Sequence, residues 1–318
     1  MPTTRTMSDA LPIVVITGGS GMVGRRLSRL LLSKGYHVRW LVRNTKHPEP
    51  GVEMFSWNPS RAEMDVNALR NVHTLINLAG AGIADKPWTN SRKKEILLSR
   101  TTPIALLQQK MQEEGLQIPN IICASASGYY MPGKASGMHS EEEQHGSGFL
   151  ADCCHQWEQA SHSLRSCCKQ FYIVRIGIVL SNKGGALPVM RLPFRFGLGS
   201  ALGNGKQAMP WIHEDDLSGI FLHLLQNNPK PGVYNAVAPA CDNNLSFGKA
   251  LASAMHKPFF MPPVPAFLLR LLKGEMADMV LQGSPVSAQK ILDTGFVFTY
   301  PDLAHALPQL EASKAEGN

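Results

Sequence analysis

The chain has 318 residues, of which 44% are hydrophobic and 17% charged, and its formal net charge is +7. This composition is typical of a globular protein with a sizeable core and excludes a fibrous or disordered chain. No apolar run reaches the roughly 18 to 20 residues of a bilayer span, and the basic residues are scattered, so we expect no membrane and no nucleic-acid partner.

The six cysteines include two adjacent pairs and no C-x-x-C spacing, which predicts neither a disulfide framework nor a metal site. We therefore expect a reducing, cytoplasmic location. Residues 1–11 lack the apolar stretch of a secretory signal and are expected to form a frayed tail, with a remnant of a targeting segment as the alternative. The C-terminal EASKAEGN is expected to be disordered, with a tail over 313–318.

The first half of the chain alternates apolar, β-rich runs with helical patterns. Strands are predicted over 13–17, 36–43, 73–79, 121–125 and 171–180, and helices near 21–34, 90–113 and 149–168. Continuous apolar strands separated by helices are typical of a parallel sheet covered on both faces. The sequence therefore predicts a doubly wound α/β fold.

Glycine and proline become frequent after Leu180, in the segments 182–188, 196–207 and 261–265. Large apolar residues interrupt each segment and need burial, so we expect loops and short helices of a smaller lobe rather than linkers. The predicted first domain covers 12–235, with some segments after 180 contributing to the lobe. The predicted C-terminal lobe covers 236–312.

The string TGGSGMVG at 17–24 follows the first predicted strand and opens the first predicted helix. Glycines there permit a tight turn, let the backbone approach a pyrophosphate and allow the helix to pack on the sheet, while the helix N-terminus attracts phosphate. A glycine triplet alone is also compatible with a plain turn, but this context favours a dinucleotide site. Its predicted residues are Gly18, Gly19, Ser20, Gly21, Met22, Val23 and Gly24.

The end of the second predicted strand indicates which dinucleotide binds. A carboxylate there would accept hydrogen bonds from the 2′-hydroxyl of NAD, but Arg43 stands at this position. A guanidinium suits the 2′-phosphate of NADP, to which it can donate two hydrogen bonds. We therefore expect NADP(H), with an ordinary surface arginine as the alternative.

With this loop, Arg43, NLAG at 77–80 and SASGYY at 125–130, the chain resembles the extended short-chain dehydrogenase/reductase superfamily. Longer strings narrow the resemblance to the atypical epimerase-family group of YfcH type, which includes the human superfamily member 39U1 and carries a C-terminal DUF1731-like module. These strings are AGIADKPW (81–88), RIGIVLSNKGGAL (175–187), PFRFGLGSALGNGKQ (193–207), WIHEDD (211–216), YNAVAP (234–239), GEMADMVLQG (274–283) and GFVFTYPDL (295–303).

The resemblance covers residues 12 to about 310 and implies a Rossmann-like NADP-binding domain with a small C-terminal α/β lobe on the substrate side. By position, it also implies cofactor contacts at Leu78, Ala79, Gly80, Arg100 and Val179. It supplies no substrate, because the chemistry of the group is largely unassigned.

Tyr130 and Lys134 have the Y-x-x-x-K spacing of the superfamily's catalytic dyad. In that dyad the tyrosine exchanges a proton with the substrate and the lysine lowers the tyrosine pKa from about 10, which requires one face of a helix. Met-Pro-Gly lies between the two residues here and opposes a helix, so we expect a loop. Counting back from Glu158 on the next predicted helix places Leu150 and Cys154 at the dyad positions. We therefore expect the usual dyad to be absent.

Other side chains are candidates for the chemistry. Ser125 is a candidate to hold a substrate carbonyl, with Tyr129 or Tyr130 as proton donor; the alternative is that this group lines the pocket or packs on the cofactor. His213 titrates near neutrality and is a weaker candidate. The acids at 215–216 are expected to cap the following helix and to pack the lobe.

Two functions are compatible with these features. The first is a cytoplasmic NADP-dependent oxidoreductase or epimerase acting on a small anionic carbonyl compound or a nucleotide sugar, with Lys206 and Arg195 as candidate anchors or plain surface charges. The alternative is a non-catalytic NADP-binding protein with a regulatory or division-linked role, motivated by the missing dyad. We expect an unidentified small-molecule substrate and a monomer or homodimer, in which segment 274–283 is a candidate dimer contact or lid.

Overall fold

The computed structural model describes residues 12–134 and 136–315; the predicted tail at 1–11 and residues 316–318 lie outside this part. Its main layer is an eight-stranded sheet in the order β10-β7-β6-β5-β1-β2-β3-β4. Neighbouring strands are parallel except for β3 and β4. The strands are β1 (Ile13–Thr17), β2 (His37–Val42), β3 (Val52–Asn58), β4 (Glu63–Met64), β5 (Val72–Asn77), β6 (Ile118–Ala126), β7 (Cys168–Ile176) and β10 (Gly232–Ala236).

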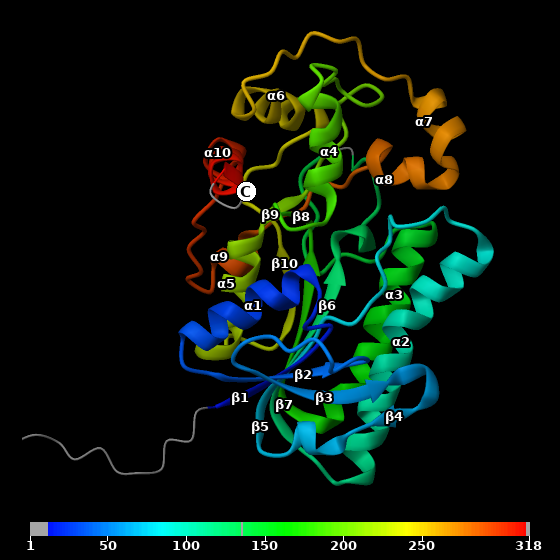
Figure 1. Ribbon diagram of the computed structural model, residues 1–318. Coiled ribbons are helices and arrows are strands. Elements are labelled where there is room, and N and C mark those ends of the chain that lie inside the picture. The colour runs from blue at the N-terminus through cyan, green and yellow to red at the C-terminus, as the bar shows by residue number, and fades with distance from the viewer. Residues whose placement is uncertain (1–11, 135, 316–318) are drawn as a thin grey trace, which may run out of the picture.

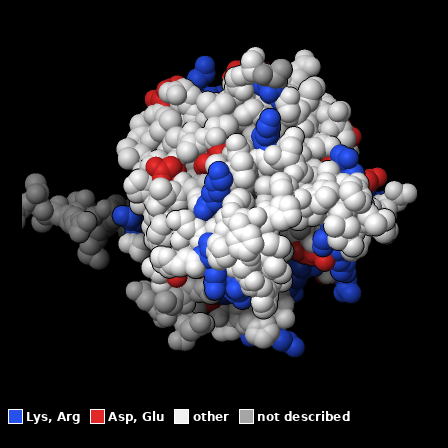
Figure 2. Space-filling model, turned by 90° about the horizontal axis from the view of Figure 1, so that it is seen from above, with Lys and Arg blue, Asp and Glu red and all other residues white. Residues whose placement is uncertain are grey.

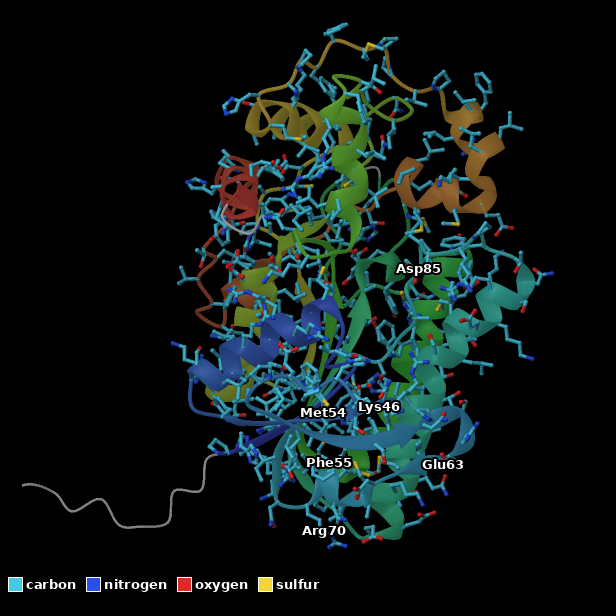
Figure 3. The ribbon with its side chains drawn as sticks, in the orientation of Figure 1. Lys46, Met54, Phe55, Glu63, Arg70 and Asp85 are labelled. Atoms are coloured by element: carbon cyan, nitrogen blue, oxygen red, sulfur yellow. The ribbon has the colours of Figure 1, made fainter. Side chains whose placement is uncertain are left out.

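Helices cover both faces of this sheet, which confirms the predicted doubly wound fold (Figure 1). One face carries α1 (Met22–Ser33), α5 (Glu214–Asn227) and α9 (Gln289–Leu292), and the other carries α2 (Asn90–Glu113) and α3 (Phe149–His162). Side chains alternate between the two layers along each strand. One hydrophobic core lies between the sheet and the layer of α1 and α5, and a second lies between the sheet and the layer of α2 and α3. Met54 and Phe55, adjacent on β3, pack against the first and the second core, respectively (Figure 3).

A smaller lobe lies beyond the carboxyl ends of the main strands (Figure 1). It contains the two-stranded parallel sheet of β8 (Ile178–Leu180) and β9 (Trp211–His213) with the helices α4 (Ala186–Arg195), α6 (Asn244–Ala254) and α10 (Leu303–Ala315). These elements share a third core, to which α4 contributes Leu187, α6 contributes Leu251 and α10 contributes Leu307.

A helical arm, residues 265–281, projects from this lobe. It consists of α7 (Ala266–Lys273), the 3-10 turn η5 (Gly274–Ala277) and α8 (Asp278–Leu281). Both ends are fixed to the loop at 201–207, since the Gly203 N–H donates to the Val264 carbonyl at 2.9 Å and the Gln207 amide donates to the Val280 carbonyl at 2.7 Å. Glu275 in the middle of the arm pairs with Lys93 of α2.

Four further 3-10 turns complete the described elements: η1 (Pro59–Arg61), η2 (Val66–Leu69), η3 (Ser127–Tyr129) and η4 (Ser163–Cys167). The predicted helix at 149–168 therefore ends in η4. The single predicted strand over 171–180 is two strands in different sheets, because the chain turns at Gly177, where a Cβ would lie 2.7 Å from the Pro210 carbonyl oxygen.

The C-terminal region differs from the expectation in two ways. Disorder of EASKAEGN was wrong for residues 311–315, which belong to α10, and Glu311 pairs there with the buried Arg191 of α4 at 2.5 Å. Within the predicted lobe at 236–312, Val286, Ile291 and Phe298 pack into the core of the main sheet. No described helix is both long enough and apolar enough to cross a bilayer.

Candidate dinucleotide and substrate site

The glycine loop joins the end of β1 to the start of α1, at the edge of the sheet where open α/β folds bind ligands. Gly18 has a φ of +67°, which favours glycine, and a Cβ there would lie 2.8 Å from the Leu78 carbonyl oxygen. A Cβ on Gly24 would lie 2.6 Å from the Gly18 carbonyl oxygen, and one on Gly19 would collide with the Trp40 ring. The loop therefore packs closely on both neighbouring strands only because these positions lack side chains.

The first turn of α1 fits an anion. Gly21 is its N-cap, no side chain caps the turn, and no acidic residue lies in it. Met22 and Val23 begin the helix, while Ser20 and Gly21 are exposed. Unsatisfied N–H groups and the positive end of the helix dipole favour a phosphate at such a place. The loop is therefore suited to a diphosphate.

The loop after β2 carries the predicted 2′-phosphate ligand. Arg43 follows the last residue of β2 and is exposed, and β2 pairs with β1, so Arg43 lies beside the glycine loop. Lys46 on the same loop is also exposed and is labelled in Figure 3. Lys46 was not among the predicted cofactor residues, although it follows Arg43 by only three residues in the sequence.

The predicted adenosine side is formed by the turn after β5. The Thr17 hydroxyl donates to Asn77 Oδ1 at 2.6 Å and accepts from the N–H groups of Leu78 and Ala79, each at 3.2 Å. These bonds hold the turn against the end of β1. The structure thus brings the NLAG string next to the glycine loop.

Arg100 and Val179 also reach this edge. A Cβ on Gly80 would lie 3.3 Å from Arg100 Cζ, and the Arg100 guanidinium lies 5.1 Å from the centre of the Trp157 ring. Burial lowers the pKa of Arg100. A Cβ on Gly185 would lie 3.6 Å from the Val179 carbonyl oxygen and 3.3 Å from Cε of Met22 in the glycine loop. All predicted cofactor residues therefore gather at one edge, and their contact with a cofactor stays a prediction.

Ser125 and Tyr130 belong to a buried hydrogen-bond network under this edge. The Ser125 hydroxyl donates to Glu158 Oε1 at 2.6 Å, and Arg175 donates to both Glu158 oxygens, at 2.8 and 2.9 Å. Arg175 also donates to the Tyr130 hydroxyl at 2.9 Å, and that hydroxyl donates to Asn235 at 2.7 Å. Burial raises the pKa of Tyr130 to about 12, although Arg175 opposes the rise.

Tyr129 is placed differently from its neighbour. Its ring packs on Arg175, whose guanidinium carbon lies 3.5 Å from the ring centre. Its hydroxyl has no hydrogen-bond partner within residues 12–134 and 136–315, and it is not a completely buried polar atom. Of the three predicted catalytic hydroxyls, this one alone has no hydrogen-bond partner among the described residues, in a side chain that is 9% exposed.

The Y-x-x-x-K spacing lies in a loop, as predicted, since 130–134 contains no helix. Lys134 pairs with Glu143 and donates to the Met138 carbonyl at 3.1 Å. On α3, Leu150 and Cys154 face the η3 turn: a Cβ on Gly128 would lie 3.5 Å from Leu150 Cβ and 3.8 Å from Cys154 Sγ. Burial raises the pKa of the Cys154 thiol to about 12.

His213 is the N-cap of α5. Its Nδ1 accepts from the Asp215 N–H at 3.1 Å, and its Nε2 donates to Gln309 at 3.0 Å. The ring is buried, its centre lies 3.8 Å from that of Tyr300, and burial lowers its pKa, so the neutral form is favoured. The structure gives His213 a capping role.

The two acids after it have other partners. Asp216 accepts from the N–H groups of Thr299 and Tyr300 at 2.8 and 2.9 Å, and Asp215 pairs with Arg26 of α1. The prediction that these acids cap the helix was wrong, because the histidine occupies that place. Their predicted role in packing the lobe is confirmed for Asp216.

The sequence argument missed the pairing of Glu158 with Arg175. A signal was present, because one arginine interrupts the apolar strand FYIVRIGIVL and such a buried charge needs a partner. Arg195 and Lys206, the predicted anchors, are both exposed in the lobe. Among the described residues, no three His, Cys, Asp or Glu side chains form a metal-binding group.

The fold and the site define an α/β protein of Rossmann type with a glycine loop suited to a diphosphate. Residues 14–153 match the model of the NAD dependent epimerase/dehydratase family, and residues 264–310 match a domain of unknown function, DUF1731. The mouse epimerase family protein SDR39U1 is 33% identical over 302 residues, 94% of this chain and 99% of that protein. An epimerase family protein of Staphylococcus saprophyticus is 36% identical over 299 residues, 93% of this chain and 98% of that protein.

Two solved structures are similar over most of the chain. The crystal structure of human SDR39U1 (isoform 2) with NADPH has a TM-score of 0.83 and 30% identity, covering 96% of this chain and 100% of that one. A nucleoside-diphosphate sugar epimerase of Corynebacterium glutamicum has a TM-score of 0.74 and 27% identity, covering 96% of this chain and 62% of that one. This chain belongs to the epimerase family, in the SDR39U1-type group that combines the epimerase domain with the DUF1731 module. The resemblance drawn from the sequence motifs is confirmed.

Proposed function

We propose that this protein is an NADP(H)-dependent oxidoreductase or epimerase acting on a small anionic carbonyl compound or a nucleotide sugar. One observation carries the proposal: the uncapped, acid-free first turn of α1 lies beside Arg43. This arrangement offers one site for a diphosphate and another for a 2′-phosphate. The NADPH in the human SDR39U1 structure supports the same cofactor here.

NADP(H), when bound, supplies or accepts a hydride at its nicotinamide ring. The protein would hold it by the glycine loop, Arg43, the 78–80 turn, Arg100 and Val179. Arg100, which lies against Gly80, would contribute a fixed positive charge near the turn. The six cysteines are all free, in keeping with the proposed cytoplasmic location.

We assign the proton transfer to Tyr129, because its hydroxyl is uncommitted and its ring lies on the Arg175 cation. Ser125 and Tyr130 are positioning residues in this proposal, since both hydroxyls are engaged in the buried network. That network holds the strand end and the η3 turn from which Tyr129 projects. His213 caps α5 and takes no part in the proposed chemistry.

The second candidate function is that of a non-catalytic NADP-binding protein with a regulatory or division-linked role. The observation that favours it is the pair of side chains at the dyad positions, where Leu150 and Cys154 face the η3 turn. A leucine and a thiol with a raised pKa cannot replace the tyrosine and lysine.

One experiment separates the two functions. Purified protein is mixed with NADPH and, in turn, with pyruvate, 2-oxooctanoate and UDP-glucose, while NADPH absorbance and the melting temperature are followed. The proposal predicts a rise in melting temperature together with either NADPH consumption by a carbonyl substrate or, with NADP⁺ as cofactor, epimerisation of UDP-glucose without net NADPH change. A rise with neither reaction favours the regulator, and no rise contradicts both.

A further inference from the structure

Helix α4 and its C-cap Phe196 present apolar side chains on two opposite faces. Leu187 and Phe194 are buried in the lobe core with α6 and α10. Val189, Leu192 and Phe196 are exposed, Val189 to 72%. At 3.6 residues per turn these two sets lie about half a turn apart. Since α6 and α10 lie on one side of α4 and the arm on the other in Figure 1, the exposed face is directed to the side of the arm.

The arm is the second unpartnered apolar element. Helix α7 contains no buried residue, and Phe267, Leu271 and Leu272 are largely exposed, Leu271 to 79%. Exposed apolar side chains that occur singly need no explanation, but groups of them on two elements of the same end of the molecule indicate a binding site.

Both elements begin or end at the proposed active site. The N-cap of α4, Gly185, lies against Met22 of the glycine loop. Just after the arm, the Gly283 carbonyl accepts from the N–H of Gly133 at 3.1 Å, and the Ser284 hydroxyl donates to the Met131 carbonyl at 3.0 Å. The exposed Met131 follows Tyr130 at the end of the η3 turn. The two apolar faces therefore flank the region above the predicted catalytic loop.

The charge pattern of this end of the molecule is sparse. Seen from above in Figure 2, broad uncharged areas lie beside a row and small groups of basic side chains. A nucleotide sugar has a diphosphate, which proteins bind with clustered cations or N–H groups. On α4 and the arm, the exposed cations Arg195, Arg270 and Lys273 lie near the helix ends, and the faces between them are apolar.

We propose that α4 and the arm bind the apolar body of the substrate, so that the substrate is an anionic carbonyl compound with an aliphatic or aromatic body rather than a nucleotide sugar. This inference rests on the proposed function, because it assigns a substrate class to the same site. Removing the substrate body and the α4 and α7 side chains from water supplies the binding free energy. Arg195 at the end of α4 offers a charge for the anionic group.

The test compares three probes by calorimetric titration into protein saturated with NADP⁺: 2-oxooctanoate, pyruvate and UDP-glucose. The first two share the same oxo acid head and differ by an aliphatic chain. Each buried methylene is expected to tighten binding roughly fourfold, so 2-oxooctanoate should bind at least about 100-fold more tightly than pyruvate. Equal affinities for the two oxo acids, or tighter binding of UDP-glucose, would overturn the proposal.

Two substitutions locate the site, and one serves as a matched control. Val189→Asp and Leu271→Asp should each weaken 2-oxooctanoate binding at least about tenfold, because a carboxylate would replace an apolar contact. Val297→Asp makes the same change at a valine that is 81% exposed, outside α4 and the arm, and should leave binding unchanged. Equal effects of all three would overturn the assignment. So would a Val189→Asp effect that merely accompanies dissociation of a dimer in light scattering, since the faces would then pair two copies.

Failure of the proposed function is seen separately. If NADPH neither binds nor is oxidised, the titrations are made on the cofactor-free protein; if 2-oxooctanoate still binds there more tightly than pyruvate and UDP-glucose, the oxidoreductase proposal fails and the assignment of the apolar site stands.

Discussion

Glu158 of α3 and Arg175 of β7 form a buried ion pair with two hydrogen bonds, Nε to Oε1 at 2.8 Å and Nη2 to Oε2 at 2.9 Å. The pair joins a helix that covers the sheet to the strand next to the edge strand β10. Through Ser125 and Tyr130 it also fixes the strand end beneath the proposed active site. The stretch 125–130 recognised in the sequence is therefore held in place by an ion pair whose two residues lie outside it.

Glu158→Gln should lower the free energy of unfolding by about 3 to 5 kcal/mol, because it leaves the Arg175 charge buried without its counterion. Urea denaturation measures this loss. Glu53→Gln is the matched control: Glu53 also pairs with an arginine at 2.8 Å, but its side chain is 42% exposed. The control should lose at most about 1 kcal/mol, and losses of similar size in the two variants would contradict the structural role of the buried pair.

Tyr129→Phe should reduce kcat by about 100-fold or more and leave the Kd for NADPH unchanged, because it removes the proposed proton donor without breaking a hydrogen bond seen in the described structure. Tyr130→Phe removes two hydrogen bonds of the buried network and should cost about 1 to 3 kcal/mol of stability while turnover persists. Steady-state kinetics and urea denaturation of the two variants check both predictions. A larger kcat loss in Tyr130→Phe would reverse the assignment.

Arg43→Ala should raise the Kd for NADPH about 10- to 100-fold, because a charge-assisted bidentate contact with the 2′-phosphate is lost. The Kd for NADH, which lacks this phosphate, should stay the same. Arg165→Ala removes an exposed arginine at the other end of the sheet, in η4, and serves as the control. Equal losses of NADPH and NADH affinity in Arg43→Ala would show that Arg43 does not bind the 2′-phosphate.

His213 should make stability depend on pH. Burial lowers its pKa below the usual 6.5, although Asp215 opposes the shift, so the unfolded chain takes up the proton first as the pH falls. The stability that the neutral, capping imidazole contributes is therefore present above about pH 6.5 and declines as the pH falls towards the folded-state pKa.

The variant His213→Asn keeps an N-cap side chain but does not titrate. The difference in melting temperature between the native protein and this variant should shrink between about pH 7.5 and pH 5.5. His73, His162 and His223, whose pKa partial burial also lowers, are common to both proteins, so their contributions cancel. A difference that does not change with pH would remove His213 as the titrating group.

Local pattern predicted the parts of the fold that depend on local chemistry. The helix expected over 90–113 has those bounds, because Thr89 caps it and its sequence favours helix throughout, even with Pro103 inside. The glycine loop could be predicted for the same reason, since a positive φ and close packing require glycine at these positions. The Met-Pro-Gly segment likewise excluded a helical dyad.

Contacts between distant segments decided the rest. β3 was not predicted because its side chains are mostly half-buried near the edge of the sheet and form no continuous apolar run. The break at Gly177 depends on the approach of Pro210, and the order in 311–315 depends on the pairing of Glu311 with Arg191. The hydrogen bonds of Ser125 and Tyr130 could not be predicted, because their partners Glu158, Arg175 and Asn235 come from distant parts of the chain.

The most direct test of the central claim, NADP(H) binding at the glycine loop, is a calorimetric titration of NADPH into the native protein and into Gly21→Asp. Gly21 is the N-cap of α1 with an ordinary φ of −73°, so aspartate can cap the helix and keep the melting temperature within a few degrees of the native value. Its charge would repel a diphosphate at the same place. The account predicts tight binding to the native protein and a loss of at least about 100-fold in the variant. Equal binding to both proteins, or none to the native protein, would contradict it.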